Sequence, residues 1–308
     1  SLRGGAMSPV LGEGTEVAQE LAEVHSSVAA GAYRHLVLAA PGIAALAQPG
    51  QFVAATVGGA TSGLLLRRSF SLHAADPVAG TVEIVVAAHG AGSTWITQRR
   101  PGDGLDLVGP LGRPFPLPSA ADTATGSHPG AAVLVGGGYG SAPLFWLAQA
   151  LRARGTTVEV ILGAASADRL FGVELAGRVA DGVTVTTDDG SVGTRGWVSD
   201  VLPAVLARSD ARDVYACGPM AMLRAVTEVA AAARAVAHVA VEEAMACGVG
   251  VCMTCVMPVI GVDGRTRMVR SCVEGPVFDG DRVRWDAFGD GMCRVPDDAV
   301  GAPQAGGH

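Results

Sequence analysis

The sequence predicts an α+β protein of three domains: an antiparallel β-barrel, an α/β domain built on a parallel sheet, and a small C-terminal cysteine-rich domain. Three observations predict this fold class. Short apolar runs separated by Gly and Pro fill the first third of the chain, strands alternate with helices in the middle, and four cysteines lie close together near the end. The expected bounds are residues 16–118, 130–237 and 238–286, with a tail over 287–308.

Length and composition exclude some classes of function. The 308 residues, 49% of them hydrophobic, suffice for separate cores, and the net charge of −7 gives no support to nucleic-acid binding. The most apolar long window, 226–241, is too short and too polar to span a membrane, and residues 1–22 lack the plan of a secretory signal. Six cysteines, four of them in a ligand-like pattern, favour a reducing compartment over a disulfide framework. We therefore expect a cytoplasmic protein.

The first domain shows the regular spacing of an antiparallel barrel or sandwich. Its apolar runs, divided by Gly and Pro, cover residues 33–40, 51–57, 64–72, 81–88 and 105–108.

One of these runs carries polar groups where a strand should alternate. It contains Arg68, Ser69, Phe70 and Ser71 in succession. An exposed strand end would explain this composition if the stretch stood alone. A flavin-binding interpretation assigns Arg68 to a pyrophosphate, Phe70 to stacking, and Ser71 to a hydrogen bond with the isoalloxazine ring.

A second glycine-containing segment, 89–95, precedes a helix that we expect to begin at Ser93 or Thr94. Gly90 and Gly92 leave the backbone amides accessible, and these amides together with the helix N-terminus can hold a second phosphate. An ordinary N-capped helix explains the same residues equally well.

The second domain opens with a strand at 131–135, a glycine-rich turn and a helix at 144–154. In such a turn the backbone can approach the phosphates of a dinucleotide, which makes Gly136, Gly138 and Gly140 candidate binding residues. Because Pro143 stands where the helix of the G-x-G-x-x-G fingerprint would continue, we expect a different nucleotide-binding variant.

Further strands are expected at 157–162, 183–187 and 213–216, with helices at 168–180, 198–207 and 219–235. The strand at 213–216 ends at Cys217, Gly218 and Pro219. Ligands of open α/β sheets bind at the carboxyl ends of strands, so these three residues and the glycine-rich turn should face one crevice. A small buried thiol is the alternative for Cys217.

The C-terminal domain contains the most specific motif, C-x4-C-x2-C followed by a fourth cysteine after sixteen residues. This spacing is typical of plant-type [2Fe-2S] ligation. Gly248 and Gly250 allow the loop to turn sharply and to direct amides at the cluster sulfurs. A structural zinc site is less well supported, because a second C-x2-C pair is missing, and a disulfide is the other alternative. The expected ligands are Cys247, Cys252, Cys255 and Cys272, the last returned by a hairpin over 256–271.

Taken in order, these motifs resemble those of the ferredoxin-reductase superfamily. The segment from Met245 to Cys255, with the later 272–278, is similar to electron-transfer subunits of heterodimeric dihydroorotate dehydrogenases. The resemblance covers about residues 16–285 and implies a FAD-binding barrel, an NAD-binding domain and a [2Fe-2S] domain. It also implies a flavin-containing catalytic subunit as partner in a hetero-oligomer. The sequence departs from the family pattern in two places: Ser69 stands where members often have proline, and the tail beyond Trp285 is an addition.

The cofactors predict the order of electron transfer. Nicotinamide exchanges a hydride, which is two electrons, whereas a [2Fe-2S] centre carries one, so a flavin must lie between them. Ser71 and Cys217 are the residues expected to position the reactants. We expect an NAD-dependent electron-transfer subunit. The alternatives are a self-sufficient NAD(P)H oxidoreductase that reduces a soluble acceptor such as ferredoxin, and a non-catalytic iron–sulfur sensor or structural metal protein.

Overall fold

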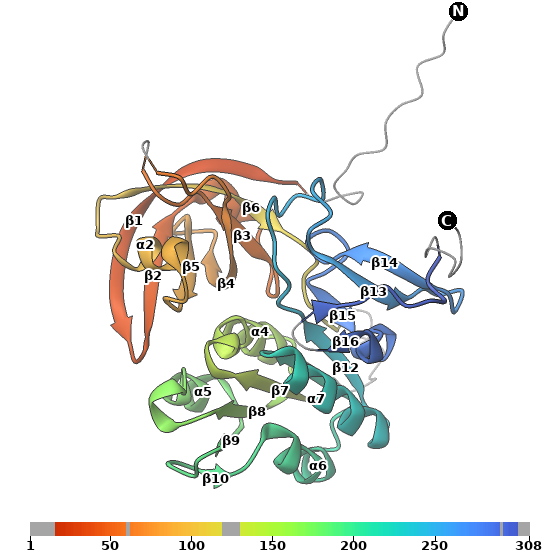
Figure 1. Ribbon diagram of the computed structural model, residues 1–308. Helices are drawn as coiled ribbons and strands as arrows, with labels where there is room; N and C mark the ends of the chain where they lie inside the picture. The colour runs from red at the N-terminus through yellow and green to blue at the C-terminus, as the bar shows by residue number, and fades with distance from the viewer. Residues whose placement is uncertain (1–15, 60–61, 119–129, 290–291, 301–308) are drawn as a thin grey trace, which may run out of the picture.

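The structure is a computed structural model, and it describes residues 16–59, 62–118, 130–289 and 292–300. A barrel formed by the N-terminal part lies beside a sheet covered by helices, and the C-terminal segments lie next to both (Figure 1). Within the described residues, no helix is long and apolar enough to cross a membrane.

Six strands close an antiparallel barrel in the order β1-β2-β5-β4-β3-β6, which confirms the predicted barrel. Side chains alternate along each strand, so every second residue points inward. Leu36, Leu72 and Ile84 are fully buried there. The strands are β1 (Ala18–Ala30), β2 (Tyr33–Ala39), β3 (Phe52–Ala55), β4 (Arg68–Asp76), β5 (Thr81–Val86) and β6 (Gly104–Leu111), with helices α1 (Pro41–Leu46) and α2 (Ala91–Thr97) between them.

Two details of the barrel differ from expectation. The long strand β1 was outside the predicted runs, because glutamates and serines occupy many of its outward positions while only Ala22 and Val24 are fully buried. Helix α2 begins before Ser93, since the Ser93 hydroxyl lies inside the first turn and accepts the backbone N–H of Gly90 at 3.1 Å.

A seven-stranded sheet in the order β10-β9-β8-β7-β11-β12-β15 forms the second layer and confirms the predicted α/β architecture. Strands β7, β8, β9, β11 and β12 run parallel, and β7 pairs directly with β11. The sheet is built from β7 (Ala131–Gly137), β8 (Thr157–Ala164), β9 (Gly182–Thr187), β10 (Thr194–Arg195), β11 (Asp213–Cys217), β12 (Val236–Ala240) and β15 (Val277–Asp279). Its helices are α4 (Ala142–Arg152), α5 (Val173–Val179), α6 (Val198–Ser209) and α7 (Met220–Ala232).

The chain order places a crevice in this sheet. On one side β7 pairs with β8, the next strand in the chain, whereas its neighbour on the other side, β11, comes four strands later. Such a reversal of strand order is the place where open α/β sheets bind ligands.

One domain boundary and one helix differ from expectation. The expected boundary at 237/238 falls inside β12, which together with the antiparallel β15 belongs to the sheet, because strand pairing depends on contacts far away in sequence. The helix expected at 168–180 is a short 3₁₀ turn, Ala167–Arg169, followed by α5. Gly172 separates the two with a φ of +77°, a conformation that ends a helix.

The predicted C-terminal hairpin is present as β13 (Val256–Ile260) and β14 (Thr266–Arg270). Beyond it, a small sheet of β16 (Phe288–Gly289) and β17 (Met292–Cys293) forms in the segment expected to be a tail.

Candidate functional site

A cavity of about 680 Å³ lies where the barrel, the seven-stranded sheet and the segment before the cysteines meet. Its size lies in the range of small-molecule and cofactor sites. One wall comes from β4, a second from the loop after β7 together with Cys217, and a third from residues 240–246. Three regions that are distant in sequence therefore share one site.

Many of the residues singled out from the sequence line this cavity. They are Arg68, Ser69, Phe70, Ser71, Gly90, Gly92, Ser93, Gly140 and Cys217. Five others do not line it: Thr94, Gly136, Gly138, Gly218 and Pro219. Thr94 lies in the first turn of α2, Gly136 near the end of β7 and Gly138 in the turn after it, while Gly218 and Pro219 follow β11.

Arg68 presents a cation to the cavity. Its guanidinium donates only to the main-chain carbonyls of Leu66 and Arg67, at 2.8 and 3.2 Å, and no carboxylate in the described part of the chain pairs with it. Arg67, in contrast, is held by Asp106 at 2.6 Å. A Cβ at Gly92 would lie 2.8 Å from Arg68 Nε, so the glycine lets helix α2 approach the arginine. This arrangement fits an anionic group such as a phosphate.

The loops after β7 and β11 lie directly against each other. A Cβ at Gly140 would lie 2.8 Å from Gly218 Cα and 2.9 Å from the Cys217 carbonyl oxygen. Only glycine permits this approach of the two backbones. The two loops therefore form one continuous edge at the carboxyl ends of adjacent strands.

Three polar side chains stand together at this edge. Burial, followed by the nearby Glu242 carboxylate, raises the pKa of Cys217 to about 12, which keeps the thiol neutral near pH 7. The Tyr139 hydroxyl donates to Glu242 Oε1 at 2.6 Å, and burial raises the pKa of this phenol as well. Glu242 is not among the predicted site residues. Its position just after the final apolar strand of a parallel sheet was the available signal.

The first cysteine sits in a loop that surrounds its sulfur with amides. Cys247 Sγ accepts the backbone N–H groups of Val249, Val251 and Cys252 at 3.4, 3.3 and 3.4 Å. Gly248 and Gly250 have φ values of +71° and +80°, which glycine adopts without strain. The loop thus supplies donors to a thiolate.

The four cysteines interact as two pairs. Hydrogen bonds from Thr254 and Cys247 lower the pKa of Cys252 to about 6. A hydrogen bond from Cys272 lowers the pKa of Cys255 to about 5. The same contact with Cys255, together with burial, raises the pKa of Cys272. Thiolate is the form that binds metal, and two pairs of cysteines suit the two irons of a [2Fe-2S] cluster.

The cysteine loop also contacts the barrel and the cavity. Cys255 and Cys272 are buried against Phe52, Ala54 and Leu111 of the barrel. Thr254, which precedes Cys255, lines the cavity wall. A group bound in the cavity would therefore be a close neighbour of one held by the cysteines.

Comparison with known proteins agrees with this geometry. Residues 242–284 match the family described as the iron-sulfur cluster binding domain of dihydroorotate dehydrogenase B. The dihydroorotate dehydrogenase B (NAD(+)) electron transfer subunit of Bacillus caldolyticus is 41% identical over 236 residues, which are 77% of this chain and 86% of that protein. The corresponding subunit of Geobacillus kaustophilus is 40% identical over 237 residues, again 77% and 86% of the two chains.

A solved structure points to the same fold. An NADH-dependent reduced ferredoxin-NADP oxidoreductase, studied for flavin-based electron bifurcation, superposes with a TM-score of 0.74 at 30% identity, over 87% of this chain and 91% of that one. The resemblance inferred from the sequence motifs is thus confirmed over the barrel, the sheet and the cysteine loop. The chain belongs to the family of dihydroorotate dehydrogenase B electron transfer subunits.

Proposed function

We propose that this chain passes electrons between NAD, FAD and a [2Fe-2S] cluster, to or from a separate flavin-containing catalytic subunit of a dihydroorotate dehydrogenase. The observation that carries the proposal is the shared cavity. Its walls combine Arg68 of the barrel, Cys217 of the parallel sheet and the 240–246 segment that leads directly into Cys247. With NAD and FAD bound in this cavity and the cluster next to it, the flavin would exchange a hydride with the nicotinamide and single electrons with the cluster.

The proposed division of the chain follows the cofactors. Residues 16–118 would bind FAD, and residues 130–237, with β12 and β15 completing the sheet, would bind NAD. The rest of 238–286 would hold the cluster, and 287–308, which includes the small sheet of β16 and β17, would be the tail. A cytoplasmic location fits the six cysteines, none of which forms a disulfide.

For the flavin, the residues of β4 are assigned by their chemistry. Arg68 neutralises a pyrophosphate, the Phe70 ring covers the isoalloxazine, and Ser71 offers a hydroxyl to the ring. The amides at Gly90, Gly92, Ser93 and Thr94 are proposed to support the phosphates.

For the nicotinamide, the binding surface is the edge formed by two touching loops. Gly136, Gly138 and Gly140 allow the backbone to approach the dinucleotide phosphates, and Gly218 and Pro219 shape the facing side. Cys217 would then lie beside the reacting ring as a small neutral thiol, which excludes water without adding a charge.

The four ligating cysteines are proposed to place the cluster at the surface used for partner contact. Around exposed Cys252, Val251 is 68% exposed and Met253 is 53% exposed, although both are apolar. Apolar side chains exposed next to a redox centre are suited to burial under a partner protein. The cluster loop would therefore be the exit for electrons.

A charge on this loop tests the assignment. We expect Met253→Glu to lower partner-dependent turnover by about 10-fold or more at limiting partner concentration, since burying an unpaired charge at the centre of an interface costs about 2 kcal/mol or more. NADH-to-dye activity should not change. Steady-state assays with increasing concentrations of the catalytic subunit would measure both.

A matched control is Val262→Glu, because Val262 is 96% exposed in the turn between β13 and β14. It should behave like the unaltered chain. Equal losses in both variants, or none in Met253→Glu, would argue that the partner docks elsewhere.

A further inference from the structure

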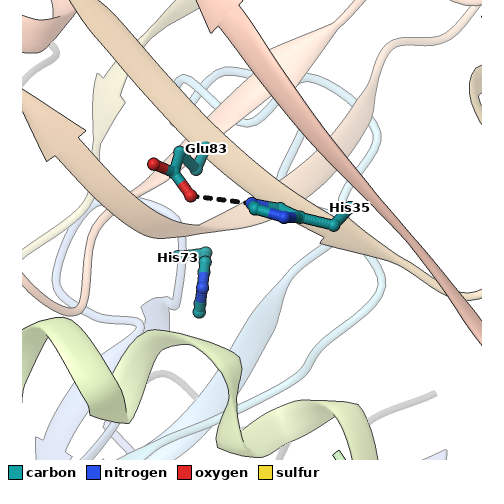
Figure 2. A group of neighbouring side chains, drawn as sticks. All are labelled: His35, His73 and Glu83. Atoms are coloured by element: carbon teal, nitrogen blue, oxygen red, sulfur yellow. Dashed lines mark hydrogen bonds and ion pairs between the residues drawn. The ribbon is translucent and has the colours of Figure 1, made fainter. Parts of the chain in front are cut away.

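A group of side chains outside the proposed electron-transfer cavity has the composition of a metal site. His35 of β2, His73 of β4 and Glu83 of β5 each offer one ligand atom, and all three atoms lie within 4.8 Å of one another. Figure 2 shows the three side chains lying together, with His35 and Glu83 joined directly. None of the three lines the proposed electron-transfer cavity.

The strand geometry explains why these residues meet. Leu36, Leu72 and Ile84 point into the barrel, so their neighbours His35 and Glu83 point outward. The same alternation turns His73 outward, because it follows the inward-pointing Leu72. The pairing of β4 with β5 shifts register between Leu72 and Ala74, so His73 is an extra residue in its strand. A bulge of this kind bends its strand locally, and His73 lies beside the other two side chains.

The His73 ring is held in a fixed orientation. Its Nδ1 hydrogen-bonds to the Ala142 carbonyl oxygen at 2.6 Å, at the start of α4. Its ring packs edge-on against His35, Phe145 and Phe171, at centroid distances of 5.2, 6.0 and 5.9 Å. With Nδ1 donating to a carbonyl, Nε2 is the nitrogen left to bind a metal. Metal-ligating histidines almost always make this second hydrogen bond.

From this geometry we propose that His35, His73 and Glu83 bind a divalent transition-metal ion of the zinc class, with three protein ligands and one position open to water. Two imidazoles and a carboxylate are an established donor set for zinc. Zinc bonds of about 2.0–2.1 Å require ligand atoms about 3.4 Å apart, so atoms that lie within 4.8 Å of one another need to move by only about 1 Å. His35 Nε2 and Glu83 Oε2, now hydrogen-bonded at 2.7 Å, would move apart slightly and exchange that hydrogen bond for bonds to the ion.

An ion here would link two parts of the protein. The ligands come from three barrel strands, and His73 is bound through Ala142 to the helix that follows the glycine-rich turn after β7. Helix α4 contacts β4 at this point. The metal would therefore brace the contact between the barrel and the sheet domain, independently of the cysteine cluster.

Zinc binding by the tag-free holoprotein tests the proposal. The protein, with FAD and iron content verified so that the cysteines are occupied, is dialysed against Zn²⁺ and its bound zinc is measured by mass spectrometry. One zinc per chain is expected. His35→Gln and Glu83→Gln should each weaken binding by more than about 100-fold, because losing a ligand exceeds the 10- to 100-fold cost of losing an outer-shell partner. Zinc should also raise the unfolding temperature of the unaltered protein but not of these variants.

The control is His25→Gln, since His25 is exposed on β1 and is not one of the three clustered residues. It should bind zinc like the unaltered chain. Flavin absorbance verifies that each variant is folded. His35 and Glu83 are both partly exposed, so each can be substituted separately as an independent test of the site. If the holoprotein bound no zinc, or if both variants kept it, the proposal would be wrong. The three residues would then be only the His35–Glu83 ion pair with His73 beside it.

Discussion

A Cys255→Ser chain should lose its [2Fe-2S] cluster and all electron delivery to a partner, while still binding FAD. Cys255 is only 2% exposed, and the cysteine beside it, Cys272, is itself a proposed ligand and cannot take its place. Clusters of this type are bound through thiolates, which a serine hydroxyl does not supply. The barrel closes through its own six strands and should keep its flavin. Iron and FAD content, with the electron paramagnetic resonance spectrum of the reduced protein, would measure the result.

The matched control is Cys293→Ser, which alters a half-buried cysteine in β17, outside the ligand loop. It should retain iron and flavin alike. A full iron content in Cys255→Ser would contradict the ligand assignment, and so would equal iron loss in the control.

The second large effect is expected at the flavin. Arg68→Ala should weaken FAD binding by about 10- to 150-fold, because one charge-assisted hydrogen bond contributes about 1.5–3 kcal/mol. Arg68 has no carboxylate partner among the described residues, so its removal leaves no buried charge unpaired. Titration of flavin-stripped protein with FAD, followed by flavin fluorescence, would measure the change.

Arg100→Ala is the appropriate control, since Arg100 is exposed in the same barrel domain and does not line the cavity. Its FAD affinity should equal that of the unaltered chain. If both variants bound FAD equally well, the cation on β4 would not be the phosphate partner.

Features that depend on neighbouring residues could be predicted from the sequence. The cysteine spacing, the glycines between the first two cysteines and the 256–271 hairpin are all local, and the structure contains the hairpin as β13 and β14. The alternating strands and helices of the sheet domain were equally clear, because each carries its own apolar pattern.

Features created by distant segments could not be predicted. Tyr139 meets Glu242 across 103 residues, and no local motif marks that pair. Strand β12 pairs with β11 in the parallel sheet, but its short apolar run does not by itself indicate which domain it belongs to. The group around His73 depends on a bulge and on a contact with α4, both of which exist only after folding.

The central claim is that this chain carries electrons for a second protein and does not oxidise an organic substrate itself. Dihydroorotate-dependent reduction of NAD⁺ by the FAD- and iron-loaded chain, with and without a dihydroorotate dehydrogenase catalytic subunit, tests it most directly. We predict no turnover by the isolated chain, NADH-to-dye activity in the same preparation, and turnover that rises with added catalytic subunit until the two are equimolar. Turnover of dihydroorotate by the isolated chain, at a rate unaffected by the second protein, would contradict the account.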